Sequence, residues 1–243
     1  FSGGAADEHT LRANKAAWDR LLLSPRGLRP LAGGHTRVGL LGRTLEHPIL
    51  LAPIAYQRMA HSDGEIATAH AASALGAGMV LSTQASVLLE SVARAFLPEP
   101  QRGPLWFQLY LQDDRNLTRD LIRRAEAAGF EALVLTVDAP VNGARDRERR
   151  NGFKLPPGIS AVNLAGLAGS GQAPAVRLKP GQSALFDGLL HAAPTWRDVE
   201  WLMGQTRLPV LLKGVLHPDD AREAARLGVA GLIVSNHGGR TLD

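Results

Sequence analysis

Short apolar runs alternate along this chain with longer stretches in which apolar residues recur at helical spacing. The runs are Ile49–Ala55, Met79–Ser82, Leu105–Tyr110, Ala132–Val137, Pro209–Lys213 and Gly231–Ser235. Continuous apolar runs of this length are typical of strands that are buried on both faces of a parallel sheet. The sequence therefore predicts six such strands.

The stretches between the runs are amphipathic and rich in alanine, which predicts helices. They are Asp63–Leu75, Ser86–Phe96, Asn116–Ala128, Thr195–Thr206 and Pro218–Leu227. Ser62 and Thr195 are predicted to cap the amino ends of two of them, because a side-chain oxygen there can accept a free backbone N–H. Gly76, Gly129 and Gly228 follow three of them, where a left-handed residue commonly ends a helix.

Strands that alternate with helices indicate a parallel sheet with right-handed crossovers. Both a doubly wound open sheet and a (β/α)8 TIM barrel fit this pattern, and the polar residues decide between them. They end nearly every run: Gln108, Tyr110, Thr136, Asp138, Lys213, Ser235 and His237. A barrel builds its site from the ends of many strands, whereas an open sheet concentrates it at one switch point. We therefore predict an α/β fold, a TIM barrel of which about six βα units are present, forming a single domain over residues 1–243.

The interval from 152 to 194 breaks the alternation. It has no clear periodicity and contains many glycines and prolines. Because it leaves the carboxyl end of the fourth predicted strand, we expect either an active-site lid or a plain mobile loop.

Composition excludes several classes of function. The net charge is only +4, and the basic residues are scattered except at Arg145–Arg150, where acids are interleaved; this run is either a solvated face or an anion site. Nucleic acid is therefore not an expected partner. The absence of cysteine excludes disulfides, thiolate nucleophiles and cysteine-bound metals. No apolar run approaches the ~18 residues that would cross a bilayer.

His237 is the first candidate for chemistry, because it follows a predicted strand and precedes Arg240 by three residues. A base beside a fixed positive charge can take a proton from an anionic substrate. Asp138 ends another strand and could orient the imidazole, although a carboxylate in that place could also cap a turn.

Four further residues have two interpretations each. Arg145 and Arg240 could clamp a carboxylate with paired donors, or either could be a surface arginine. Tyr110 could donate to a developing oxyanion, or be a half-buried aromatic residue with its hydroxyl in water. Lys213 ends an apolar strand, so its ammonium needs an anionic partner unless it is a Schiff-base nucleophile.

Seven segments, taken together, resemble one enzyme family almost from end to end. They are Phe1–Leu11, Leu51–His61, Leu81–Ser86, Trp106–Tyr110, Thr136–Pro140, Leu212–Val215 and Ser235–Arg240. In this order and spacing the chain resembles the FMN-dependent L-2-hydroxy acid oxidases and dehydrogenases, which include glycolate oxidase, lactate oxidase, flavin lactate dehydrogenase and mandelate or hydroxymandelate oxidase.

The resemblance implies a role for each polar residue. It makes His237 the base that removes a proton from the substrate, and Asp138 the carboxylate paired with it. Tyr110 is implied to bond the substrate hydroxyl and the emerging carbonyl. Arg145 and Arg240 are implied to hold the substrate carboxylate. The implied reaction oxidises a 2-hydroxy acid to a 2-oxo acid, and dioxygen or another acceptor then removes the electrons.

The implied cofactor is FMN, and no metal is expected. The residues that the resemblance assigns to the flavin are Pro53, Ile54, Ala55, Ser82, Gln108, Thr136, Lys213, Ser235 and His237. Lys213 would stabilise the anionic reduced flavin, which provides the anionic partner that its position requires. The rival hypotheses are a Schiff-base aldolase that uses Lys213 and a non-catalytic barrel fragment.

Gln84 and Asn142 match positions that line the substrate side-chain pocket in the family. Gln84 stands where glycolate oxidases tend to have tryptophan, and Asn142–Arg145 is closer to the lactate and mandelate branches. We therefore expect lactate or an aryl 2-hydroxy acid as the substrate.

The chain also lacks parts of the family pattern. A tyrosine expected just before Phe1 is not present, nor are the last two strands, which hold the FMN phosphate in the family. We therefore expect a domain truncated at both ends that is not an autonomous enzyme, and either pairs with a second chain supplying those strands or is a fragment. By resemblance we expect a homotetramer that is cytoplasmic or peripheral to a membrane.

Overall fold

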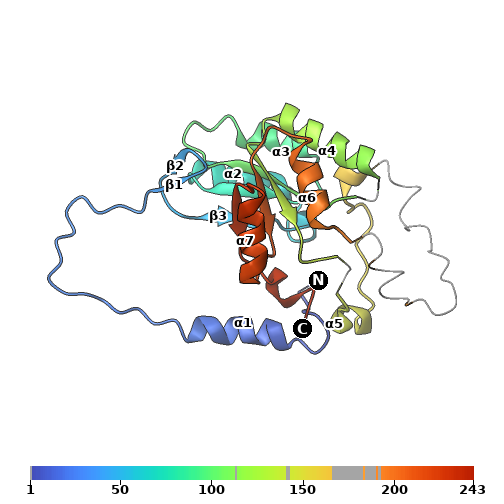
Figure 1. The fold of residues 1–243 in the computed structure, drawn as a ribbon, viewed down its shortest axis with the longest axis horizontal. Coiled ribbons are helices and arrows are strands. Elements are labelled where there is room, and N and C mark those ends of the chain that lie inside the picture. Colours follow the sequence, from blue (N-terminus) through green and yellow to red (C-terminus); the bar gives the residue numbers. More distant parts are fainter. Residues whose placement is uncertain (1, 113, 141–142, 166–182, 184–189, 191–192) are drawn as a thin grey trace.

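The computed structural model describes residues 2–112, 114–140, 143–165, 183, 190 and 193–243. Its centre is a curled parallel sheet whose six strands lie side by side in chain order (Figure 1). The strands are β3 (Leu50–Leu51), β4 (Gly78–Leu81), β5 (Leu105–Leu109), β6 (Ala132–Thr136), β7 (Val210–Lys213) and β8 (Gly231–Ile233). A doubly wound sheet would reverse its order part-way, so this order is that of a partial TIM barrel, as predicted.

The helices between the strands are α2 (Glu65–Ala74), α3 (Leu89–Phe96), α4 (Arg115–Ala128), α6 (Trp196–Met203) and α7 (Pro218–Arg226). All five lie where the sequence predicts them. Thr195 forms a capping box with Asp198 at the start of α6. Gly76, Gly129 and Gly228 have φ values of 69°, 91° and 81°, the left-handed conformation expected after a helix.

The prediction that Ser62 caps a helix is wrong. Helix α2 begins at Glu65 after Gly64, and the Ser62 hydroxyl donates to the Asp63 side chain instead. The reason is the Glu65 carboxylate, which is fully buried and accepts hydrogen bonds from the Ser86 N–H (2.8 Å) and hydroxyl (2.7 Å). This contact to the loop after β4 fixes the first turn of the helix.

Side chains of the sheet alternate between two apolar layers. Phe107, Leu133 and Leu212 belong to the larger core, which includes buried residues of α2, α3, α4 and α6. Trp106 and Val134 belong to a smaller cluster on the opposite face. Because the central strands are buried on both faces, their runs are apolar without interruption.

Several elements were not predicted. They are α1 (His9–Asp19), a hairpin of β1 (Val38–Leu40) and β2 (Arg43–Leu45), α5 (Asp146–Arg150), and the 3-10 segments η1 (Gln57–Met59), η2 (Val162–Leu164) and η4 (His237–Gly239). Arg43 donates to the Gly103 carbonyl (2.9 Å) and pairs with Glu131 (3.3 Å), just before β5 and β6. The hairpin therefore lies at the amino ends of these strands.

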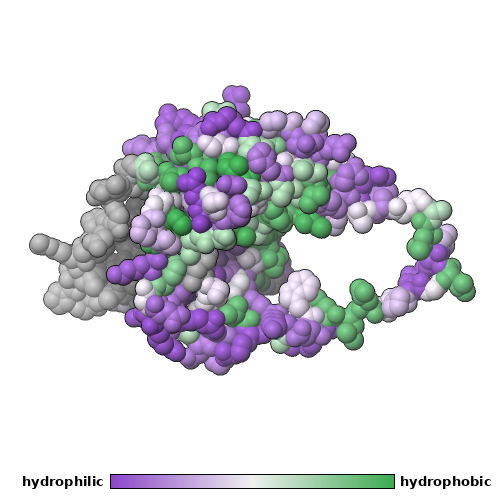
Figure 2. All heavy atoms as spheres, turned by 180° about the vertical axis from the view of Figure 1, so that it is seen from behind, coloured by the Kyte–Doolittle hydropathy of each residue, from purple (hydrophilic) through white to green (hydrophobic). Residues whose placement is uncertain are grey.

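Residues 20–37 form an arm that extends away from the sheet between α1 and the hairpin (Figure 1). Its leucines, at positions 21, 22, 23, 28 and 31, are each exposed by 68% or more. Figure 2 shows the apolar side chains along this arm. None of the helices in the described part of the chain has the length and apolarity to cross a bilayer.

The edge strands are short and only partly buried. Strand β3 has two residues and β8 has three. Ile49 and Val234 beside them are 57% and 77% exposed. Both edges of the sheet are therefore short and have exposed apolar residues beside them.

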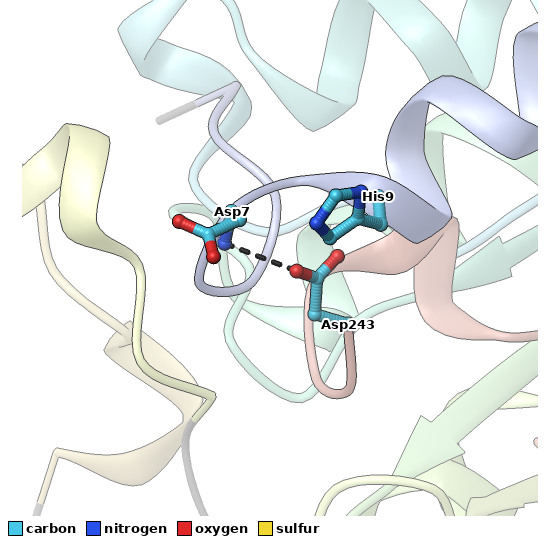
Figure 3. Close-up of side chains that lie close together, drawn as sticks. All are labelled: Asp7, His9 and Asp243. Atoms are coloured by element: carbon cyan, nitrogen blue, oxygen red, sulfur yellow. Dashed lines mark hydrogen bonds between the residues drawn. The ribbon is translucent and has the colours of Figure 1, made fainter.

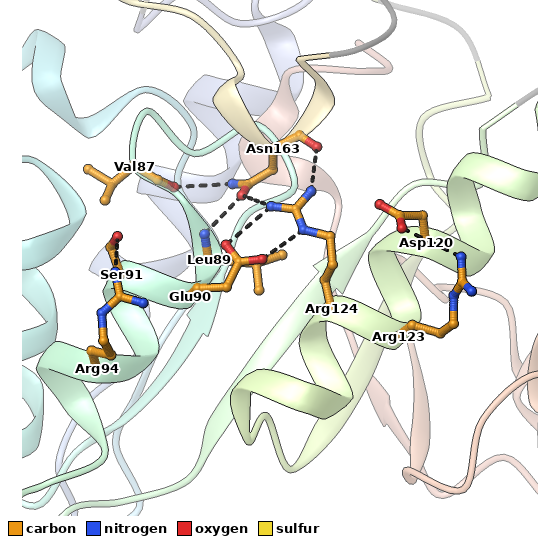
Figure 4. A network of polar contacts seen from close by, with 9 residues as sticks. All are labelled: Val87, Leu89, Glu90, Ser91, Arg94, Asp120, Arg123, Arg124 and Asn163. Carbon is orange, nitrogen blue, oxygen red and sulfur yellow. Dashed lines mark hydrogen bonds and ion pairs between the residues drawn. The ribbon is translucent and has the colours of Figure 1, made fainter.

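Much of the predicted lid, residues 166–182, 184–189 and 191–192, lies outside the described residues. Its first part is described and packs on the barrel through Asn163, which is 1% exposed. The Asn163 amide accepts from the Leu89 N–H (2.9 Å) and donates to the Val87 carbonyl (3.2 Å) at the start of α3 (Figure 4). Arg124 of α4 donates to the Asn163 carbonyl and to Glu90, so one network joins η2, α3 and α4.

Candidate active site

The imidazole of His237 meets the carboxylate of Asp138 at the carboxyl ends of β6 and β8. His237 Nδ1 lies 2.7 Å from Asp138 Oδ1. The two side chains are 25% and 9% exposed. With the carboxylate at Nδ1, the other ring nitrogen, Nε2, is the one that can accept a proton.

The backbone at His237 is in the left-handed region (φ 57°), and so are Gly238 (φ 66°) and Gly239 (φ 70°). A non-glycine residue seldom adopts this conformation, and histidine tolerates it better than most. The two glycines after His237 are therefore required by the turn, which allows the chain to lead from the imidazole to Arg240.

Gly214, the residue after β7, packs directly on Asp138. It has a φ of 106°, and a Cβ there would lie 2.4 Å from both Cβ and Cγ of Asp138. Asp138 Oδ2 is buried without a hydrogen-bond partner in the described part of the chain. Only glycine leaves room for the carboxylate at this place, so Gly214 fixes where the Asp138–His237 pair sits.

Arg145 and Arg240 converge on the carboxylate of Glu148 in α5. Arg145 Nε lies 3.1 Å from Glu148 Oε2, and Arg240 Nη2 lies 3.1 Å from Glu148 Oε1. Arg240 Nη1 also donates to the Gly3 carbonyl at 2.6 Å. The two arginines of the predicted clamp are therefore brought together, with an anion of the protein between them.

The amino-terminal segment belongs to the same cluster. Ala5 N–H donates to the Gly239 carbonyl (2.7 Å), and Asn14 of α1 exchanges two amide hydrogen bonds with Asn236 (3.1 and 2.7 Å). A Cβ on Gly143 would lie 2.4 Å from the Arg240 carbonyl oxygen. The segments that carry the two arginines therefore touch backbone to backbone.

Tyr110, at the end of β5, lies among these charges. The pKa of the Tyr110 hydroxyl is raised to about 12, chiefly by burial and also by the negative charge of Asp138, while Arg145 and Arg240 act to lower it. The hydroxyl consequently remains protonated, and able to donate a hydrogen bond, at neutral and moderately alkaline pH.

The strand ends of β4, β5 and β6 carry a buried chain of neutral polar groups. Ser82 donates to Gln108 Oε1 (3.4 Å), and Gln108 Nε2 donates to Thr136 Oγ1 (3.0 Å). All three side chains are 5% exposed or less. Thr83, which was not predicted, also donates to Gln108 through its backbone N–H (3.1 Å).

Lys213, at the end of β7, is 7% exposed, and its ammonium donates to Ser235 Oγ at 3.1 Å. The same oxygen accepts the backbone N–H of His237 (3.0 Å). Burial lowers the pKa of Lys213, and nearby Asp138 raises it. The described residues provide no salt bridge to this ammonium, so an anionic group bound beside it would fit the site.

The remaining predicted residues lie on the loops after β3 and β4. Pro53 and Ala55 are half-buried, and Ile54 is 53% exposed. The Tyr56 N–H donates to the Gln84 carbonyl (3.1 Å), which holds the two loops together. The predicted pocket residue Asn142 lies outside the described residues.

Asp7, His9 and Asp243 form a separate group of possible metal ligands (Figure 3). All three are exposed. The Asp243 carboxylate accepts the backbone N–H groups of Asp7 and Thr10, each at 3.0 Å. Its oxygens therefore act as a cap near the start of α1.

Sequence reasoning missed Glu148, Gly214, Gly143 and Gly3. One signal was available for Glu148, because an acid three residues after Arg145 can pair with it on a helix. The three glycines gave no signal, since their contacts join segments far apart in the chain.

Comparison with known proteins matches the whole chain to one family. The profile of the family described as FMN-dependent dehydrogenase matches residues 1–243. An L-lactate oxidase of Alicycliphilus denitrificans is 49% identical over 243 residues, which is 100% of this chain and 64% of the relative. A 4-hydroxymandelate oxidase of Amycolatopsis orientalis is 44% identical over 246 residues, covering 100% of this chain and 66% of the relative.

A solved structure of mandelate oxidase with (S)-2-phenylpropionate superposes with a TM-score of 0.83 at 41% identity, covering 100% of this chain and 63% of that one. The chain thus spans roughly two thirds of the length of the relatives it matches, 64% for the lactate oxidase above. On the match over its full length, the chain belongs to the FMN-dependent dehydrogenase family.

Proposed function

We propose that this chain carries the substrate-oxidising centre of an FMN-dependent L-2-hydroxy acid oxidase. The observation that supports this most strongly is the Asp138–His237 pair at 2.7 Å, beside two arginines and a protonated tyrosine. These groups form a base, an anchor for an anion and a hydrogen-bond donor at one end of a barrel.

His237 acts as the base. Asp138 holds Nδ1, so Nε2 takes a proton from the substrate, and the carboxylate then stabilises the imidazolium that forms. The 2-hydroxy acid loses two electrons and two protons to become the 2-oxo acid. His237 can act as the base in either mechanism, whether the proton that it takes comes from the substrate hydroxyl group or from C2.

Arg145 and Arg240 bind the substrate carboxylate, which orients the carbon to be oxidised. Tyr110 donates to the substrate hydroxyl oxygen, and this hydrogen bond strengthens as that oxygen gains negative charge. With a pKa of about 12, the hydroxyl remains a hydrogen-bond donor at neutral and moderately alkaline pH.

FMN supplies the two-electron acceptor when it is bound. Ser82, Gln108 and Thr136 would contact the polar edge of the flavin ring. Lys213, together with Ser235, would lie beside the part of the ring that becomes negatively charged on reduction. The backbone of residues 53–55 would lie against the ring. This assignment fits the buried donors and acceptors at the ends of β4 to β7. The matched part is 64% of the lactate oxidase relative, and we propose that the residues that hold the FMN phosphate correspond to the remainder.

We propose L-lactate as the substrate, with an aryl 2-hydroxy acid as the alternative, and dioxygen as the electron acceptor. Three of the relatives, at 47–49% identity, are named L-lactate oxidase. Another is named 4-hydroxymandelate oxidase. Gln84 lies on the loop after β4, and we assign it to the pocket for the substrate side chain.

Anaerobic titration of the FMN-loaded protein that contains this chain tests the proposal. L-Lactate should bleach the flavin absorbance, D-lactate should not, and air should restore the colour. Bleaching by glycolate alone would refute the choice of substrate. A protein that binds no flavin, and forms a borohydride-trapped adduct on Lys213, would favour the aldolase instead. Flavin binding with no bleaching by any L-2-hydroxy acid would indicate a non-catalytic barrel.

A further inference from the structure

Glu148 lies between the two guanidinium groups that the proposed function assigns to the substrate carboxylate. Its side chain is 12% exposed, and each carboxylate oxygen is 3.1 Å from a different arginine. It joins the segment after β6 to the segment after β8. None of the roles assigned above uses this residue.

Glu148 determines the net charge of the clamp that Arg145 and Arg240 form. Arg145 and Arg240 together carry two positive charges on side chains that are 31% and 23% exposed. Like charges in such partly buried positions repel one another more strongly than they would in water. Glu148 offsets one of them, so these three side chains together carry a net charge of +1, which matches a substrate with one carboxylate.

The geometry of the contacts also leaves room for a substrate. Arg145 Nε lies 3.1 Å from Glu148 Oε2, so one edge of this guanidinium faces the carboxylate. A guanidinium held on one edge by a carboxylate has a fixed plane, which prepares its other edge for a second acceptor. Arg240 is fixed from two sides, by Glu148 and by the Gly3 carbonyl.

We propose that Glu148 is a positioning residue that orients both arginines and sets the net charge of the clamp, so that the site selects 2-hydroxy monocarboxylates. This inference rests on the proposed function. It predicts that removing the charge of Glu148 releases the fixed planes of both guanidinium groups, which weakens binding of the substrate carboxylate. It also raises the net charge of the clamp to +2, which relaxes the preference for one carboxylate over two.

Replacing Glu148 by glutamine keeps its shape and removes its charge. In the holoenzyme, E148Q should raise the KM for L-lactate about tenfold and change kcat less than about threefold, because the carboxylate is anchored before and after the chemical step. The inhibition constant of the neutral analogue L-lactamide should stay the same. The ratio of kcat/KM for L-malate to that for L-lactate should rise, and E148D should restore part of the wild-type KM.

Arg147→Gln provides the matched control. Arg147 also lies on α5, but its guanidinium pairs with Glu8 and not with Glu148. It should leave all of these constants unchanged. An unchanged or lower KM in E148Q, or an equal loss of affinity for lactate and lactamide, would overturn the inference.

Pyruvate separates this inference from the proposed function. It carries the same carboxylate but has no hydroxyl group to oxidise, and its binding can be followed as a rise in unfolding temperature. If the wild-type protein oxidises no 2-hydroxy acid, the proposed function fails. A pyruvate-induced shift that is present in the wild type and reduced in E148Q would still support the role of Glu148, and equal shifts in the two proteins would refute it.

Discussion

Two polar networks in this chain combine arginines with carboxylates, and they differ in how completely their groups are paired. Around Asn163 (Figure 4), both oxygens of Glu90 accept from Arg124, and Asn163 bonds through both atoms of its amide. The hydrogen bond from Arg124 lowers the pKa of Glu90, which keeps this carboxylate ionised.

The network around Asp138 is not complete in this way. Asp138 Oδ2 is buried without a partner among the described residues, and no salt bridge there compensates the ammonium of Lys213. Buried polar groups are normally paired, so a network with unused hydrogen-bonding capacity indicates where a ligand fits. The first network holds helices together, and the second is suited to chemistry.

The largest expected effect is a loss of activity when the network around Asp138 is changed. His237→Gln removes the base, so kcat/KM for L-lactate should fall by about 10²–10⁴-fold. The rate of anaerobic flavin bleaching measures this. Replacing His35 in the exposed arm by glutamine is the control and should have no effect. Retention of more than a tenth of the activity in His237→Gln would show that another group is the base.

A change in the network around Asn163 should instead lower the stability of the fold and leave the activity unchanged. Asn163→Ala leaves the Leu89 N–H and the Val87 carbonyl without their buried partner, so the free energy of unfolding should fall by about 2–4 kcal/mol. Chemical denaturation measures this change, and the kcat of the molecules that remain folded should not change. Arg123→Gln breaks only the exposed pair with Asp120 in the same view and should cost less than about 0.5 kcal/mol.

Tyr110→Phe removes a donor from the second network only. The hydrogen bond to a developing oxyanion should be lost, lowering kcat by about 10-fold to 100-fold. Because the pKa of Tyr110 is about 12, its hydroxyl keeps its proton below pH 10. The pH profile of kcat/KM should therefore keep its shape in the variant. Loss of an alkaline limb would contradict the assignment.

The smallest expected effect concerns Lys213 and pH. Burial lowers the pKa of this ammonium below its ordinary value, and a bound anion favours the charged form. FMN affinity should therefore be greatest at the lower pH and weaken by about threefold as pH rises through the lowered pKa. Fluorescence titration of FMN measures this. Lys213→Met should bind more weakly with no such dependence, and equal pH slopes in the two proteins would remove Lys213 from the flavin site.

Most of the barrel could be predicted from the sequence, because strands that are buried on both faces leave continuous apolar runs. The six runs and the five helices between them were found from this pattern alone. Strand β3 was predicted as seven residues and has two, since an edge strand has a partner on one side only. Helix α1 was not predicted; it has no buried residue, so no apolar face revealed it.

The candidate site could be predicted only in part. His237, Asp138 and Tyr110 follow strands, so their side chains were expected at one end of the barrel, and the structure places them there. Glu148 and Gly214 could not be found in the same way. Their roles depend on contacts between segments, and no local pattern records that Gly214 lies against Asp138.

The contact at Gly143 has a consequence for redesign. A Cβ there would lie 2.4 Å from the Arg240 carbonyl oxygen. The spacing between the segments that carry the two arginines is therefore fixed by contact between backbone atoms. Side-chain exchanges around the clamp would alter its charge or its reach, but they would not widen it. An engineer who wants a bulkier substrate would therefore leave this contact unchanged and substitute Gln84, the residue proposed above for the side-chain pocket.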